Sequence, residues 1–544
     1  MPTAPALTNK QLNTNALITS FDVIFKAAFG PHTETMFTVQ KDQLFTLIKS
    51  LTKAEKRSFR LYVNRFQSAG DTKFLQLFDV LDRLSEYDEE LVLKRLPEVE
   101  KRHLSNLKRH LYKQILTSLR LIYIQKNIDI QIREQLDFAR ILYGKGMYMQ
   151  SLRILERIKK TALEHHQDIL HLEILEFEKM IEARHITRSR KVENKMEGLL
   201  EEAAHRSYVT HYSNLFSNFN IQMHGWYIVH GHAKNEGEEQ AVQEFFERNM
   251  PQGWEEKKLT FFEKANWYQS KMWYHYIRLD FELAAEQARQ WVELFHTDEQ
   301  MKQMDPDLYM RALYYLLVLL YLMRSREEFA AYLHAFEAFE REFSEQMNDN
   351  SRMIVFVYLN LSRLNYSLLE RDFKGGILLA KRIEQELPEH EAYMDAHRSL
   401  LFYFKFAYLF FSDGQCEKAL EYLNEIIHLK SAFLREDLHF NARLLHLLCH
   451  YELEHYDLLD YLISSVQRQF HKGADISELH QNSLRFLRQL TQIPLAGQPD
   501  AFRQFQRKLK NLQENKYESK ALNYLDIPAW VEGHVPGVKV GVGE

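Results

Sequence analysis

The feature that most restricts the fold of this chain is a short pattern that recurs along it at a nearly constant spacing. In "SDGQCEKALEYLNEIIH", residues 412–428, Gly414 marks a turn, the apolar residue Cys416 follows it, and the small residue Ala419 comes three positions later. Related anchors follow bends elsewhere, at Tyr148, Phe281, Phe329, Phe373 and Tyr456. From Phe329 to Tyr456 the anchors lie about 40 to 44 residues apart, and Phe281 lies about 48 residues before Phe329. A period of this length indicates stacked supersecondary units.

The composition indicates that these units are helical. The 544 residues include only 18 Gly and 11 Pro, roughly half or less of the usual shares of about 7% and 5%, so tight turns and helix breakers are few. In a helical hairpin, the anchor would fill the groove between the two helices, and the small residue would let them approach closely. One hairpin cannot bury its apolar face alone, so neighbours stack. We therefore expect an all-α protein, an α-solenoid in which antiparallel helix pairs form a right-handed superhelix.

The unit around Gly414 resembles the tetratricopeptide repeat. With Gly414 at the turn glycine of that family, matching residues fall on its first-helix, second-helix and terminal-proline positions: Tyr403, Phe406, Ala407, Phe410, Ala419, Leu423 and Ile426, with Pro388 in the preceding unit. The resemblance covers about two-thirds of the chain. The period here exceeds the 34 residues of the family, and its Trp-Leu-Gly signature is mostly absent, so we expect longer helices and a less regular superhelix. The peptide-binding residues of the family cannot be transferred.

Changes in sequence character divide the chain into five segments. Residues 1–36 are rich in Thr, Asn, Ala and Pro and predict a poorly ordered extension, with Met36 as an alternative start. Residues 37–130 predict a small helical unit, in which Thr52 and Glu55 have the spacing of a capping box. Residues 131–471 predict the hairpin array, with further turns near His185 and at 230–237. Residues 472–518 predict capping helices. Residues 519–544 predict a non-helical tail whose segment 524–530 docks on the last helices.

Charge, cysteine content and hydropathy exclude several classes of protein. The 70 basic and 75 acidic residues give a net charge of −5, which argues against a dedicated nucleic-acid coat. Two cysteines, Cys416 and Cys449, exclude a disulfide scaffold and favour the reducing cytoplasm. The strongest apolar run, residues 312–323, is too short to span a membrane. Since no phosphate-binding loop, nucleophile elbow or metal signature occurs, we expect neither an enzyme nor a bound cofactor.

One short histidine-rich stretch raises the question of a metal site. His446 and His450 share a helix face and flank Cys449 in "HLLCH". The residue after His446 is Leu447, where a zincin motif needs Glu, and no spaced cysteine pair supplies further ligands. Because the chain has 25 histidines, pairs at this spacing arise by chance, and we predict no metal site.

Two groups of residues are candidates for binding partners. The first is aromatic and lies around residues 266–281: Trp267, Tyr268, Trp273 and Tyr274, together with Tyr315. These rings suit either a buried seam or a surface that clamps a peptide. The second is basic and lies on one expected helix: Lys101, Arg102, Lys108, Arg109 and Lys113. These residues suit either a solvated face or contact with nucleic-acid phosphates.

The architecture favours a non-catalytic function. Rigid stacked helices present side chains that are already arranged for a partner, which lowers the entropy lost on binding. We therefore expect a scaffold or adaptor that binds a protein or peptide on its concave face, with the aromatic group as the contact region. The alternative is a regulatory protein whose basic N-terminal unit touches nucleic acid while the repeats sense a partner or ligand.

Overall fold

The computed structural model describes residues 42–66, 73–185, 195–255, 258–390, 394, 396–428, 436–470, 477–519, 522 and 524–535. Every regular element in these ranges is helical, and consecutive helices pack mainly against their neighbours, which confirms the expected all-α solenoid. The extension expected for residues 1–36 lies outside the described residues. The chain forms two compact units, Met1–Thr210 and His211–Glu544, and the boundary falls inside one long helix, α10 (Lys195–His230). The hairpins expected at 131–471 therefore belong to two units rather than to one array.

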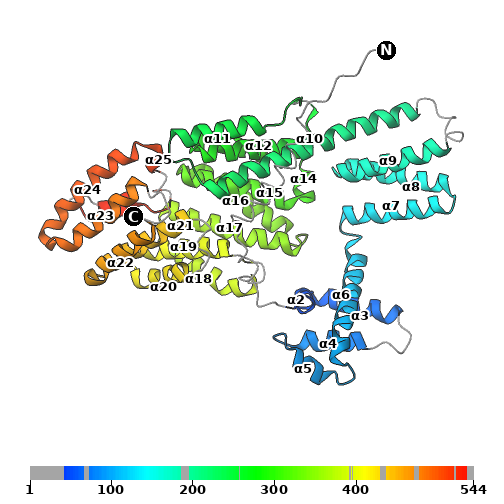
Figure 1. The fold of residues 1–544 in the computed structure, drawn as a ribbon, viewed down its shortest axis with the longest axis horizontal. Helices are drawn as coiled ribbons and strands as arrows, with labels where there is room; N and C mark the ends of the chain where they lie inside the picture. Colours follow the sequence, from blue (N-terminus) through cyan, green and yellow to red (C-terminus); the bar gives the residue numbers. More distant parts are fainter. Residues whose placement is uncertain are drawn as a thin grey trace, which may run out of the picture. The chain divides into compact units, whose positions relative to one another are not determined.

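The helices of the first unit (Figure 1) form two large hydrophobic clusters and a small one that consists of Leu175, Leu199 and Ala203. One joins α2 (Gln43–Ser50), α3 (Lys53–Phe66), α4 (Lys73–Arg83), α5 (Glu89–Arg95) and α6 (Lys101–Tyr123). The other joins α7 (Ile128–Gly144), α8 (Tyr148–Glu164) and α9 (Asp168–His185). The predicted capping box before α3 is confirmed, because Glu55 N donates to Thr52 Oγ1 at 3.2 Å and Thr52 N donates to Glu55 Oε2 at 2.8 Å.

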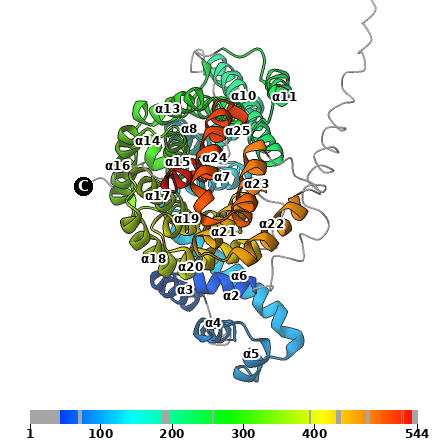
Figure 2. The same ribbon diagram turned by 90° about the vertical axis from the view of Figure 1, so that its left-hand side faces the viewer.

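The second unit is a run of helical hairpins (Figure 1). After α10 come α11 (Glu236–Asn249), α12 (Phe261–Ile277), α13 (Phe281–Thr297), α14 (Gln300–Met304), α15 (Pro306–Leu322), α16 (Arg326–Phe343), α17 (Asp349–Glu370) and α18 (Phe373–His390). The run continues with α19 (Ala396–Ser412), α20 (Cys416–His428), α21 (Glu436–Glu452), α22 (Tyr456–Phe470), α23 (Glu478–Gln492), η4 (Leu495–Gly497), α24 (Gln498–Gln513), α25 (Lys516–Ser519) and α26 (Ile527–Gly533). Figure 2, which looks along the hairpin run, shows α13, α16, α18, α20 and α22 following one another around its edge. Among the described residues, no helix is long and apolar enough to cross a membrane.

Most hairpins share one turn, which sets where the second helix begins. A residue with positive φ stands two positions before the second helix in each of six hairpins: Gly146, Leu279, Arg324, Arg371, Gly414 and Glu454. At Gly414 the turn is closed by two backbone hydrogen bonds, from Gly414 N to Phe411 O at 3.0 Å and from Gln415 N to Phe410 O at 2.8 Å. These bonds satisfy carbonyls at the end of the first helix, as in a Schellman motif.

This turn corrects the alignment of one predicted anchor. Helix α16 begins at Arg326, two residues after Arg324, so Phe329 lies three positions into the helix, where Ala419 lies in α20. Phe329 is fully buried, and so are its counterparts Ser151, Ala284, Ala419 and Leu459. In the sequence "RSREEF" the first residue of the helix is the polar Arg326, so the prediction took the aromatic Phe329, three residues later, as the first residue.

The other predicted anchors lie where the pattern indicated. Tyr148, Phe281, Phe373, Cys416 and Tyr456 are each the first residue of a second helix. Cys416 is buried, while the four rings are half-buried and pack against the core clusters. The hairpin contact is therefore made chiefly by the residue three positions after the anchor. That position accepts a small side chain or a large one, as long as it is apolar or, at Ser151, hydrogen-bonded to Ala139 O at 2.8 Å.

The tail differs from the prediction of a non-helical segment, because residues 527–533 form α26. The Asp526 side chain accepts a hydrogen bond from Ala529 N at 3.1 Å and caps the helix. Pro528 lies in the first turn, where its missing N–H costs no intrahelical hydrogen bond. A good cap and a well-placed proline thus start a short helix in a segment whose Gly and Pro content favoured a coil.

Candidate functional site

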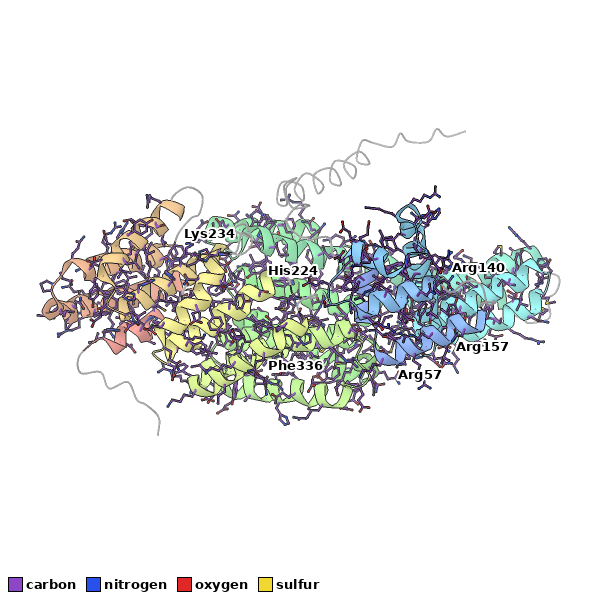
Figure 3. All side chains as sticks on the ribbon, turned by 90° about the horizontal axis from the view of Figure 1, so that it is seen from below. Arg57, Arg140, Arg157, His224, Lys234 and Phe336 are labelled. Carbon is purple, nitrogen blue, oxygen red and sulfur yellow. The ribbon has the colours of Figure 1, made fainter. Side chains whose placement is uncertain are left out.

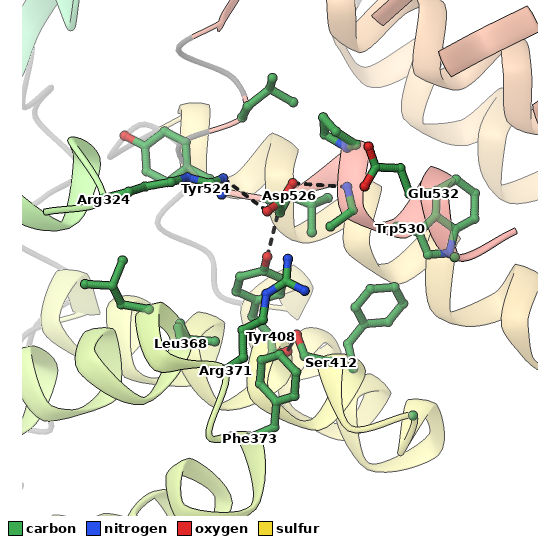
Figure 4. Close-up of a pocket in the computed structure, with 18 of the residues that line it drawn as sticks. Arg324, Leu368, Arg371, Phe373, Tyr408, Ser412, Tyr524, Asp526, Trp530 and Glu532 are labelled. Atoms are coloured by element: carbon green, nitrogen blue, oxygen red, sulfur yellow. Dashed lines mark hydrogen bonds and ion pairs between the residues drawn. The ribbon is translucent and has the colours of Figure 1, made fainter. Parts of the chain in front are cut away.

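A cavity of about 950 Å³ lies at the ends of several hairpins of the second unit, and we call it the turn cavity. Three turns contribute to it, those that join α15 to α16, α17 to α18 and α19 to α20. The C-terminal end of α21 and the segment 524–534 complete the wall. Figure 4 shows its central polar residues: Arg324, Arg371, Tyr408, Asp526 and Trp530.

Two arginines reach the turn cavity because they occupy the left-handed position of their turns. Arg324 has φ 56° and Arg371 has φ 59°. The Arg324 guanidinium pairs with the Asp526 carboxylate, with 3.1 Å between Nη2 and Oδ2. The Arg371 guanidinium lies beside Tyr408 (Figure 4). Neither Arg371 nor Arg326, which also lines the cavity, forms an ion pair with any described residue. Three carboxylates line the cavity as well: Asp526 and Glu532 come from the segment 524–534, and Glu452 comes from the hairpins.

The segment 524–535 is held by one backbone contact and by several side chains. Asp526 N donates a hydrogen bond to Tyr408 Oη at 3.1 Å. Burial, together with the nearby Asp526 carboxylate, raises the pKa of Tyr408 to about 12, so its hydroxyl keeps its proton at neutral pH. Leu525, Ile527 and Val531 are at most 1% exposed and join the core of the last hairpins. The predicted docking of this segment is confirmed.

A second anchoring point lies at the C-terminal end of α21. Trp530 Nε1 donates to Glu452 Oε1 at 2.5 Å, and His534 Nε2 lies 3.2 Å from the same oxygen. Burial opposes ionisation of Glu452, but hydrogen bonds from His534 and Trp530 outweigh it and lower the pKa of Glu452. The Trp530 ring lies at 5.5 Å from the Phe502 ring and at 5.7 Å from the Tyr451 ring. The indole is therefore fixed by both a charge-assisted hydrogen bond and ring contacts.

A lysine without a carboxylate partner lies on α19 one turn before Tyr408. Burial lowers the pKa of Lys405 to about 7. Its Nζ lies 4.5 Å from the centroid of the Tyr321 ring, and no carboxylate among the described residues pairs with it. The Lys405 ammonium therefore lies against an aromatic face rather than a carboxylate.

The aromatic candidate group packs into the core of the second unit. Trp273 is 5% exposed, and its ring lies 5.2 Å from that of Tyr315, whose pKa is raised by burial. Trp267 lies 5.4 Å from Trp254, and Tyr274 lies 4.3 Å from Phe246. Tyr268 is half-buried against the same cluster. These rings contact one another more than they face outward, and none lines the turn cavity.

The basic candidate group is spread along α6, and most of its members have acidic neighbours. Lys108 pairs with Asp42 and also donates to Tyr87 Oη at 2.9 Å. Lys101 lies 3.5 Å from Glu89, and Arg102 lies 2.6 Å from Glu100. Arg109 and Lys113 are exposed. Of two other basic side chains of the first unit that Figure 3 shows, Arg140 contacts the Glu173 carboxylate and Arg157 contacts the neutral Gln135 amide, at 2.5 Å each. Little unpaired charge is therefore concentrated on this helix.

Two histidines of α21 and one in the turn that follows it form a contact chain. The ring centroids of His446 and His450 are 4.6 Å apart, and His450 Nδ1 lies 3.0 Å from His455 Nδ1. Burial and the neighbouring His450 and Arg443 lower the pKa of His446 to about 4, so it is neutral at pH 7. Within the described ranges, no group of three or more His, Cys, Asp or Glu residues is arranged to hold a metal ion.

Sequence reasoning missed the arginines of the turn cavity. Neither Arg324 nor Arg371 belongs to a recognisable sequence motif. Only the alignment of the turns shows that two bends without glycine place both arginines in one cavity. A signal was present, because both follow a long apolar helix and precede a second helix by two residues.

Comparisons with protein-family models, curated proteins and solved structures found no match for this chain.

Proposed function

We propose that this chain is a non-catalytic helical-repeat scaffold that binds a protein or peptide partner on the inner side of its second unit, at the turn cavity. The observation that carries the proposal is the segment 524–535, which lies against several hairpins and is bound as a peptide would be. Its contacts are a backbone N–H on Tyr408, a carboxylate on Arg324 and an indole on Glu452. A peptide segment of a partner protein can offer the same three groups: a backbone N–H, a carboxylate and an indole.

Two properties of the turn cavity support binding. The turns that carry Arg324 and Arg371 are closed by backbone hydrogen bonds to the preceding helices, so these side chains start from fixed positions. Fixed starting positions reduce the entropy lost when a partner binds. The positive charge of Arg326 and Arg371 favours a partner with acidic residues.

Cys416 and Cys449 are free thiols in the structure, which supports our expectation of a reducing cytoplasm.

The proposal is tested by placing a photo-crosslinking amino acid, p-benzoylphenylalanine, at Arg326 of the full chain in its own cells. Arg326 is exposed and lines the turn cavity. The matched control carries the same amino acid at Tyr461, which is 63% exposed and does not line the cavity. We expect a discrete adduct from position 326 that is absent from position 461 and is lost when Arg371→Glu is added. Equal adducts from both positions, or an adduct that Arg371→Glu leaves unchanged, would contradict the proposal.

A further inference from the structure

The segment 524–535 differs from the hairpins in how it is held. Each hairpin packs chiefly against its neighbours in sequence. This segment packs against α24, which lies nearby in sequence, but its polar groups also contact residues from three distant hairpins. Asp526 meets Arg324, which is 202 residues away, and Tyr408, which is 118 residues away. Trp530 meets Glu452, which is 78 residues away. Helix α26 has seven residues and packs against α24, where the Phe502 ring lies 5.5 Å from that of Trp530. A short amphipathic helix in a groove formed by other helices is a common mode of peptide recognition.

The contacts of the segment fall into a simple spacing. Asp526 is the N-cap and pairs with Arg324, and Trp530, four residues later, reaches Glu452. Leu525, Ile527 and Val531 supply the apolar anchors between and beside them. Because Asp526 and Trp530 are one helical turn apart, a peptide of this pattern can satisfy both polar contacts at once. The spacing therefore defines which partner the site would accept.

The site has room and charge that the segment does not use. About 950 Å³ of the turn cavity lies beside it. Arg371 and Arg326 line this space and form no ion pair with described residues. Arg324 itself is 64% exposed despite its pair with Asp526. An incoming segment with further acidic residues could therefore make ion pairs that residues 524–535 leave unmade.

We propose that residues 524–535 are an internal ligand that occupies the partner site, and that the partner supplies a short helical peptide with an acidic N-cap residue, flanking aliphatic residues and a tryptophan four residues later. This inference rests on the proposed function and adds the chemistry of the partner and its regulation. The covalent link gives the internal ligand an effective concentration on the order of millimolar. The internal ligand therefore weakens the binding of a competing peptide unless its own contacts are loosened. The partner displaces it by carrying the same anchors together with more negative charge.

The test uses a fluorescein-labelled peptide with the sequence of residues 522–535, LNYLDIPAWVEGHV, and fluorescence anisotropy with the full chain. The loosened variant carries Asp526→Asn and Trp530→Ala. The control variant carries Asp500→Asn, since Asp500 on α24 pairs with its exposed neighbour Arg503 and with no other residue of the described ranges. We expect the loosened variant to bind the peptide at least about tenfold more tightly than the unmodified chain and the control variant do. A peptide with the same two substitutions should not bind.

A charge exchange tests the location of binding. Arg324→Asp added to the loosened variant should abolish binding of the unmodified peptide, and a peptide with Arg in place of the residue corresponding to Asp526 should restore it in part. If the loosened variant keeps its helical circular dichroism but binds no more tightly than the unmodified chain, the inference is wrong. If the loosened variant loses its helical signal, the segment is a fixed part of the core and the inference is equally wrong.

A measurement on the unmodified chain needs no variant. Excess unlabelled peptide should raise the hydrogen-exchange rates of the chain's own amides at 527–533 at least about tenfold, because the peptide takes their place. Unchanged exchange at saturating peptide would overturn the inference. The two proposals can fail separately. If a crosslinked adduct forms at position 326 and the peptide does not compete with it, the proposed partner site is supported but the internal-ligand inference is wrong.

Discussion

At the scale of single residues, the position three places into each second helix decides how closely the hairpin closes. In α18 this residue is Gly376, and a Cβ built on it would lie 2.6 Å from Leu409 Cδ2 and 3.0 Å from Ser367 Cβ. Leu409 is fully buried, so its side chain cannot easily move aside. The glycine therefore serves a close approach between α17, α18 and α19 rather than a turn.

Replacing Gly376 with alanine should destabilise the protein. Although alanine favours helix over glycine by about 1 kcal/mol, the added methyl group overlaps buried atoms, and overpacking of this kind costs about 1–3 kcal/mol. We expect a lower thermal unfolding midpoint by differential scanning calorimetry. The matched control is Gly225→Ala in α10, where nothing lies within 4 Å of the new Cβ, and it should raise the midpoint. Stabilisation by both substitutions would show that the neighbours of Gly376 yield freely.

At the scale of elements, the left-handed turn explains why hairpins with little sequence similarity share one geometry. Glycine takes this conformation at Gly146 and Gly414, but Leu279, Arg324, Arg371 and Glu454 take it elsewhere. A side chain in this region of φ costs roughly 1–2 kcal/mol per residue. The backbone hydrogen bonds and the packing of the following helix stabilise these turns enough to hold the strained residue.

A pair of opposite substitutions measures this cost. Glu454 is exposed and has φ 57°, so Glu454→Gly should stabilise the protein by up to about 1 kcal/mol. Gly414 has φ 78° and open space around a new Cβ, so Gly414→Ala should destabilise it by a similar amount, from backbone strain alone. Chemical denaturation of both variants checks the signs. Destabilisation by Glu454→Gly would mean that the Glu454 side chain makes a contact worth more than the strain.

The turn also explains how much of the fold the sequence could predict. Where glycine marks the bend, as at Gly146 and Gly414, sequence spacing gave the correct first residue of the next helix. At bends without glycine it succeeded where an aromatic residue begins the second helix, as at Phe281. It failed by three residues at Phe329, because α16 begins with Arg326 and its first aromatic residue comes three positions later. The turn cavity was missed for a related reason. The conformation of the turns, which the sequence does not reveal, places its arginines. By contrast, Asp526 and Trp530 stand in a segment whose aromatic content alone indicated docking.

At the scale of the second unit, one cluster of charges links residues near the two ends of the hairpin run. Glu239 on α11 accepts hydrogen bonds from Tyr517 Oη at 2.6 Å and from Lys516 Nζ at 2.7 Å, and from Arg278 Nη2 at 2.7 Å. The Tyr517 contact joins residues 278 positions apart. In a repeat array that is stabilised only by nearest neighbours, terminal repeats unfold first. A link of this kind makes the end repeats depend on each other.

The link should also make stability depend on acid pH. Burial opposes ionisation of Glu239, but hydrogen bonds from Lys516, Tyr517 and Arg278 outweigh it and lower its pKa to about 2. Because the pKa is lower in the folded state than in the unfolded state, the stabilisation is fully present above about pH 4.5 and is lost as the pH falls toward 2. We expect Glu239→Gln to reduce the free energy of unfolding at pH 7 by about 2 kcal/mol, since Lys516 is partly exposed and screened.

The pH profile separates this link from an ordinary surface contact. The difference between the unmodified chain and Glu239→Gln should shrink steadily between pH 4.5 and pH 2, when both are followed by urea denaturation. The matched control is Glu244→Gln on the same helix, whose side chain is exposed and contacts only Gln240, and it should change stability little at any pH. Hydrogen exchange at pH 7 should rise in both α11 and α25 of the Glu239→Gln variant. A rise in α11 alone would mean that the two ends of the run open independently.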